Sequence, residues 1–121
     1  MRKIGTVVKV KKGESIPVLN IDQTGWRGRV TDRGQDRMLG IYYCVEWDSI
    51  TLENIGNKQI YRMHKNNKDW TKDIFGRGSI IAAKERDTEE DVKSKIKTIK
   101  TMIKNRDKRL QRILNTKSHN N

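Results

Sequence analysis

The residues whose types and spacing are best suited to chemistry lie in the stretch GWRGRVTDRGQDR, residues 25–37. The planar guanidinium group of arginine pairs with phosphate through two parallel hydrogen bonds, and an exposed indole ring stacks on a nucleic-acid base. We expect the arginines of this stretch to contact phosphate as a group. Its tryptophan joins that site only if exposed, since tryptophan is more often largely buried. The candidate residues are Trp26, Arg27, Arg29, Arg33 and Arg37.

A second and larger set of cations follows in the C-terminal third of the chain. Residues 93–121 hold ten basic side chains and one acidic side chain, whereas residues 1–92 hold 17 and 14. Five lysines recur at spacings of four, three, four and four residues, which places them on one face of a helix. Such a helix can lie along a nucleic-acid backbone, where each neutralised phosphate releases counterions. The candidate residues are Lys93, Lys97, Lys100, Lys104, Lys108, Arg109 and Arg112.

Two shorter basic segments complete the set of candidate nucleic-acid-binding residues. Lys9, Lys11 and Lys12 lie close together in VKVKKG, and Arg77 lies between two glycines in FGRGS. The glycines permit backbone amides to approach a phosphate. The spacing does not match a phosphate-binding P-loop, however, and a hairpin turn is the plainer interpretation.

Catalytic residues are few in this sequence. One cysteine, Cys44, and two histidines, His64 and His119, are too few for a closed zinc site without added carboxylates. Glu46 and Asp48 are expected to project together from one strand, as metal ligands, as paired acids or, more often, as partners of nearby arginines. No catalytic constellation can be assembled. We therefore expect a protein that is not an enzyme and that uses no metal or cofactor.

The elements that must position these residues change in type near residue 87. Residues 1–86 carry short apolar runs broken by turn-forming residues, which predict a small β-barrel. The five expected strands are 6–10, 28–32, 40–48, 59–63 and 79–83, and RGQDR (33–37) reads as a loop. In the third strand, Ile41, Tyr43, Val45 and Trp47 share one face, against Tyr42, Cys44, Glu46 and Asp48 on the other.

From residue 87 to 117 the pattern predicts one long basic amphipathic helix, followed by a disordered tail at 118–121. Asp87 or Thr88 can cap this helix, and acidic residues occupy its first turn. A nearly heptad-spaced apolar seam follows, and it either packs against the barrel or pairs with a second copy as a coiled coil. The seam residues are Val92, Ile96, Ile99, Ile103, Leu110 and Ile113.

The arrangement TVVKV, GWRGRV and YYCVEW resembles the KOW type of small Src-homology-like (SH3-like) β-barrel. In that family a glycine-led turn, G-x-x-G-x-V, feeds a strand near the beginning of the barrel, and Gly25, Gly28 and Val30 occupy those positions here. The resemblance covers residues 4 to 48, and at most to 83. It departs from the family in a longer first loop, which contains ESIPVLNIDQ. The resemblance implies binding of RNA, ribosomal components or transcription complexes through loops at one end of the barrel.

The excess of basic residues indicates which kind of molecule the protein binds. Lys and Arg number 27 against 15 Asp and Glu, a formal net charge of +12, which favours polyanionic partners. No apolar stretch has the length of a signal peptide or of a membrane span, and the single cysteine forms no intrachain disulfide, so we expect a cytoplasmic protein without a membrane partner.

We therefore predict non-catalytic binding of DNA, RNA or a nucleoprotein complex. The first alternative is a small adaptor or inhibitor that docks on a nuclease or on the transcription or translation machinery. Its Lys-, Ile- and Asn-rich composition is typical of bacteria with AT-rich genomes, their phages and mobile elements. The second alternative is a homo-oligomer, such as a homodimer, joined through the C-terminal helix. The sequence leaves both alternatives open.

Overall fold

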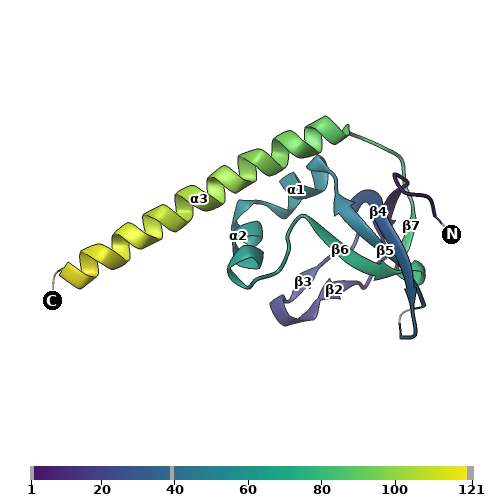
Figure 1. Cartoon of the computed structure of the whole chain (residues 1–121), viewed down its shortest axis with the longest axis horizontal. Coiled ribbons are helices and arrows are strands. Elements are labelled where there is room, and N and C mark those ends of the chain that lie inside the picture. The colour runs from purple at the N-terminus through teal and green to yellow at the C-terminus, as the bar shows by residue number, and fades with distance from the viewer. Residues whose placement is uncertain (1, 39, 120–121) are drawn as a thin grey trace.

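The computed structural model describes residues 2–38 and 40–119, which form a five-stranded antiparallel sheet and a long C-terminal helix (Figure 1). The sheet has the strand order β6-β5-β4-β1-β7. A mainly β fold with a C-terminal helix is thus confirmed. The two outer strands of the sheet are not paired with each other, so the predicted barrel is not closed by hydrogen bonds. The strands are β1 (Val7–Val10), β4 (Arg27–Asp36), β5 (Gly40–Trp47), β6 (Lys72–Gly76) and β7 (Ile80–Ala82).

The long connection between β1 and β4 folds into a second, two-stranded sheet. It consists of β2 (Ser15–Ile16), the 3-10 helix η1 (Pro17–Leu19) and β3 (Ile21–Asp22). Ile16, Leu19 and Ile21 are buried in the main core. The insertion ESIPVLNIDQ is therefore a packed hairpin, anchored because its apolar residues are removed from water.

Four of the five predicted strands are present, and the strand predicted at 59–63 is wrong. That segment belongs to α2 (Asn57–Lys65), which follows α1 (Ser49–Ile55) at Gly56. Ile60 and Met63 are three residues apart and both fully buried, which is helical spacing. The fifth strand is instead β6, which pairs with β5 from Glu46↔Lys72 to Tyr42↔Gly76.

Two predicted turns are also different in the structure. Residues 33–36, expected as loop, continue β4 and pair with β5 as far as Asp36↔Gly40. Antiparallel pairing satisfies the backbone groups of this polar segment, whatever its side chains. The turn expected at FGRGS is the end of β6 followed by the 3-10 helix η2 (Arg77–Ser79), which leads to β7 at the opposite edge of the sheet.

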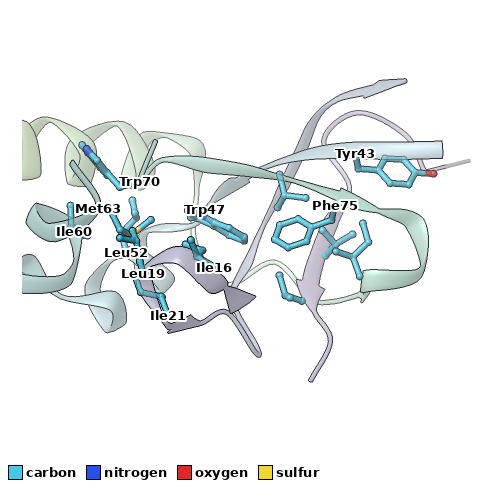
Figure 2. Packing of buried hydrophobic residues seen from close by; sticks show 14 of the residues in the cluster. Ile16, Leu19, Ile21, Tyr43, Trp47, Leu52, Ile60, Met63, Trp70 and Phe75 are labelled. Atoms are coloured by element: carbon cyan, nitrogen blue, oxygen red, sulfur yellow. The ribbon is translucent and has the colours of Figure 1, made fainter. Parts of the chain in front are cut away.

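One continuous apolar core joins the sheet to the helices (Figure 2). The predicted inner face of β5 is confirmed at Tyr43, Val45 and Trp47, which are buried while the residues between them are only half-buried. Ile41, the fourth predicted member, is half-buried and packs against the core. Trp47 lies near the middle of the cluster, and Phe75 packs against it edge-on at 5.8 Å between ring centroids. Leu52, Ile60 and Met63 extend the core under the helices.

The glycines before β4 have two different physical roles. Gly25 has a φ of 81°, which side-chain-bearing residues rarely adopt. Gly28 lies in β4 opposite Trp47, and a Cβ there would lie 2.1 Å from the carbonyl oxygen of Glu46. Val30, the next residue of the motif, is buried. Close approach of two backbones therefore accounts for Gly28.

We expect Gly28→Ala to lower the free energy of unfolding by about 2 kcal/mol, because the added methyl group overlaps main-chain atoms that cannot move without disturbing the β4–β5 pairing. Gly78→Ala is the matched control, since a Cβ at Gly78 meets no atom within 4 Å. Its effect should stay within about 0.5 kcal/mol. Urea denaturation of both variants measures the difference, and equal effects would contradict the role given to Gly28.

Candidate nucleic-acid interface

The C-terminal helix α3 (Glu89–His119) begins at a reciprocal cap. The backbone N–H of Asp91 donates to Oγ1 of Thr88 at 3.1 Å, and the backbone N–H of Thr88 donates to Oδ2 of Asp91 at 2.9 Å. This is a capping box with Asp in the place of the usual Glu. The helix continues through residues 118 and 119, which were predicted as tail, and Asn120 and Asn121 lie outside the described residues.

The first half of the apolar seam attaches α3 to the body of the protein. Val92, Ile99 and Ile103 are buried, and Ile96 is half-buried. The seam therefore packs against its own core here, next to α1 and α2, and does not serve a coiled coil over this length. The second half differs, since Leu110 and Ile113 are 42% and 48% exposed. Figure 1 shows this part of α3 extending beyond α1 and α2.

A buried ion pair holds the segment that leads into α3. Nη2 of Arg29 donates to Oδ1 of Asp87 at 2.7 Å and to Oε1 of Glu85 at 2.9 Å. Ser49 donates its backbone N–H and its hydroxyl to Oδ2 of Asp87 at 2.7 and 2.6 Å. Burial alone would raise the pKa of Asp87, but the hydrogen bonds from Ser49 and Arg29 outweigh it, so the pKa is lowered.

A neighbouring pair fixes the start of α1 to the same segment. Asp48 caps α1 by accepting the backbone N–H of Thr51 at 2.7 Å. Arg86 donates to both carboxylate oxygens of Asp48, at 2.7 and 3.0 Å. Asp48 is therefore the partner of an arginine and lies beyond the end of β5. It does not project beside Glu46 as a second acid.

The only acidic residue after position 92 attaches α3 to α2. Asp107 accepts the hydroxyl proton of Tyr61 at 2.6 Å, and Nζ of Lys65 lies 3.1 Å from its carboxylate. The guanidinium of Arg106 lies over the Tyr61 ring, 5.1 Å from its centroid. The hydrogen bond from Tyr61 and then the one from Lys65 lower the pKa of Asp107. This carboxylate is therefore bonded to α2, and it also lines one hollow together with Lys100, Lys104 and Lys108.

The lysines predicted to share a face form one exposed row, which we call the lysine stripe. Two shallow hollows lie along it, of about 420 and 480 Å³, and both are lined by Lys100 and Lys104. The stripe is therefore continuous. Its members are Lys93, Lys97, Lys100, Lys104 and Lys108.

Few lysines of the stripe form ion pairs with carboxylates of the protein itself. Lys93 reaches Glu90 at 3.5 Å with both groups largely exposed. Lys95, which lies off the stripe, pairs with Glu53 of α1. Among the residues that the structure describes, Lys97, Lys100 and Lys104 have no carboxylate partner. Lys108, Arg109 and Arg112 are exposed on the second half of the helix.

The structure divides the arginine group around residues 25–37. Arg29 is 8% exposed and bound to two carboxylates of its own chain, so it leaves the candidate interface. Trp26 is half-buried and packs against the core, edge-on to Trp47 at 5.1 Å between ring centroids. Arg27 donates to the carbonyl of Lys84, and Arg33 donates to the carbonyl of Arg2.

The remaining candidates are accessible but lie away from the stripe. Arg37 and Arg77 are exposed in the β4–β5 connection and in η2. Lys11 and Lys12 are exposed after β1, and Lys9 is half-buried within it. Sequence reasoning missed Arg2, which lies with Arg77 around a hollow at the sheet. No spacing rule connects positions so far apart in the chain.

Comparison of the chain with models of protein families, with curated proteins and with solved structures finds no match. Within residues 2–38 and 40–119, no three His, Cys, Asp or Glu side chains come together in a way that could hold a metal ion. In the same part of the chain, no helix has the length and apolarity needed to cross a membrane.

Proposed function

We propose that the protein binds nucleic acid, alone or within a nucleoprotein, through the lysine stripe and without catalysis. The observation that carries this proposal is the exposed, continuous row of five lysines on α3. After position 92 the only acidic residue of this helix is Asp107, which is bonded to α2. From the first lysine to the last, the stripe spans about 22 Å at 1.5 Å per residue. Duplex DNA of that length carries about 13 phosphate charges, and the lysines can contact those on the side that faces the helix.

The chemistry of the stripe favours backbone contact over base reading. Lysine acts as a flexible point charge, whereas base edges are read mainly by arginine, asparagine and glutamine forks. Figure 1 shows α3 as one continuous helix, and its buried seam residues and the Tyr61–Asp107 hydrogen bond attach it to the rest of the protein. We therefore propose binding with little sequence preference.

Titration of a labelled 20-base-pair duplex and of a 20-nucleotide single strand at increasing salt tests this proposal. If all five lysines contact phosphate, log K should fall with log salt with a slope of about −4.5 for the duplex and about −3.5 for the single strand. DNA and RNA versions of both probes identify the preferred nucleic acid. Absence of binding at 50 mM salt, or affinity that does not change with salt, would contradict the proposal.

A specific observation keeps the adaptor function as the second candidate. Leu110, Ile113 and Leu114 are 42%, 48% and 51% exposed on the extended part of α3. Apolar residues at such spacing fit the groove of a protein partner. Capture of partners from native cells with and without nuclease separates the two functions, because a partner retained after nuclease treatment favours the adaptor.

We also propose that residues 4–83 are a KOW-type domain. The glycine-led turn supports this, since Gly25 needs its positive φ and Gly28 needs to lack a Cβ. The order of strands gives further support, because β4, β5 and β6 are neighbours in chain order, with α1 and α2 between the last two, and β1 lies between β4 and β7.

A further inference from the structure

A hollow of about 500 Å³ lies at the sheet, apart from the lysine stripe. Three segments distant in sequence form it: the N-terminal residues before β1, the first half of β5, and η2. None of the described residues that line it is acidic. We call it the arginine hollow, and its lining residues are Arg2, Ile41, Tyr43, Arg77 and Gly78.

Backbone contacts hold Arg2 at this hollow. Its backbone N–H donates to the hydroxyl of Tyr43 at 2.8 Å, and its carbonyl accepts from Nη1 of Arg33 at 2.8 Å. Its own guanidinium donates to the carbonyl of Ile80 at 3.4 Å. Each guanidinium has five N–H donors, and these contacts use one donor of Arg2 and one of Arg33. Most donors of the Arg2 guanidinium therefore stay available to an anion, whereas Arg33 is not among the residues that line the hollow.

Arg77 adds a second guanidinium group to the lining of the hollow. It is exposed, and among the described residues it has no hydrogen bond or ion pair from its side chain. The hydroxyl of Tyr43 adds a neutral donor. Tyr43 as a whole is 2% exposed. Figure 2 shows the Tyr43 hydroxyl at the end of the core cluster, directed away from the other labelled side chains. The hydroxyl oxygen accepts from Arg2, while within the described residues its own proton has no acceptor.

We propose that the arginine hollow is a phosphate-binding site. Guanidinium groups from different segments and one buried hydroxyl surround a space large enough for a phosphate with an attached sugar, and tetrahedral phosphate presents acceptors in several directions. The site deepens the proposed function and rests on it for the source of the phosphate, a nucleic-acid strand. Its occupant is then either a terminal phosphate monoester or a backbone diester.

Gly78 offers a sharp test of this site. Its φ is not in the left-handed region, and a Cβ there meets no atom within 4 Å. A side chain at this position, which lines the hollow, therefore meets no neighbouring atom. Gly78→Asp places a carboxylate beside Arg2 and Arg77, and Gly78→Asn is the neutral control of equal size.

The experiment is a titration followed by amide NMR, with inorganic phosphate and with 5′-phosphorylated and 5′-hydroxyl (dT)4 as probes. We expect phosphate to shift the amides of Tyr43, Arg77 and Gly78, with affinity at least tenfold weaker in Gly78→Asp than in Gly78→Asn. A preference for the 5′-phosphorylated strand identifies the monoester as the source, and equal shifts identify the diester. Absence of shifts at the hollow, or equal affinity in the two variants, would overturn the site.

The two proposals fail in different ways. Lys100→Gln with Lys104→Gln should leave phosphate binding at the hollow unchanged, because neither lysine lines it. If an oligonucleotide shifts only the amide signals of α3, that result would contradict the phosphate site at the hollow and support binding at the lysine stripe. Phosphate shifts at the hollow without binding of any strand would support the phosphate site and contradict the proposed nucleic-acid function.

Discussion

The double substitution Lys100→Gln and Lys104→Gln is expected to weaken binding of duplex nucleic acid about 60-fold at 0.1 M salt. Each phosphate contact contributes about 0.9 to the slope of log K against log salt, so two lost contacts reduce the slope by about 1.8. These two lysines line both hollows of the stripe and therefore lie at its centre. Glutamine has nearly the helix propensity of lysine, so α3 should stay folded.

Fluorescence anisotropy over 50 to 200 mM salt measures both the affinity and the slope. The matched control is Lys72→Gln with Lys84→Gln, which removes the same charge from two exposed lysines, one on β6 and one after β7. If binding depends on net charge alone, both double variants will lose affinity equally. That result would contradict a defined interface on α3, whereas a selective loss in the first variant supports it.

Asp87→Asn is expected to lower the free energy of unfolding by about 3 kcal/mol, because it leaves the buried guanidinium of Arg29 without its closest charged partner. The side chains of Arg29 and Asp87 are 10% and 4% exposed. The substitution also weakens the bonds from Ser49, which tie α1 to the segment before α3. Both effects should loosen the attachment of α3 to the sheet.

Glu85→Gln is the matched control for this ion pair. Glu85 binds the same nitrogen of Arg29 at 2.9 Å, but its side chain is 62% exposed, so solvent screens the interaction. Its loss should cost less than about 1 kcal/mol. Urea denaturation at pH 7 compares the two variants. Equal losses of unfolding free energy in the two variants would show that burial does not determine how strongly each carboxylate binds Arg29.

The lowered pKa of Asp87 also predicts how stability depends on pH. The folded protein binds a proton at Asp87 less readily than the unfolded chain does, so this residue stabilises the fold above its ordinary pKa of 3.8. The stabilisation is lost as pH falls below that value. The wild type should therefore lose its advantage over Asp87→Asn between about pH 5 and pH 2. A constant difference across that range would contradict the assignment.

The sequence by itself determined the elements whose pattern is local. The acidic first turn with Asp87 or Thr88 as its cap is a local pattern. The spacing of Val92, Ile99 and Ile103 and the recurrence of the lysines follow from the 3.6-residue period of one helix. The alternation in β5 likewise predicted its buried face. In each case the residues that matter lie a few positions apart, so the pattern is visible without tertiary contacts.

Only the tertiary structure decided which cations are accessible. Arg29 and Arg33 look alike in the sequence, yet the first is buried against Asp87 and the second contacts Arg2. The helix at 57–65 was missed because QIYRM is short and rich in strand-forming residues, and packing of Ile60 and Met63 on the core prevails over local propensity. The arginine hollow unites residues 2, 43 and 77 through the pairing of β5 with β6 and the hydrogen bond from Arg2 to Tyr43. Contacts between such distant positions depend on the folded chain as a whole, which is why no local pattern contains them.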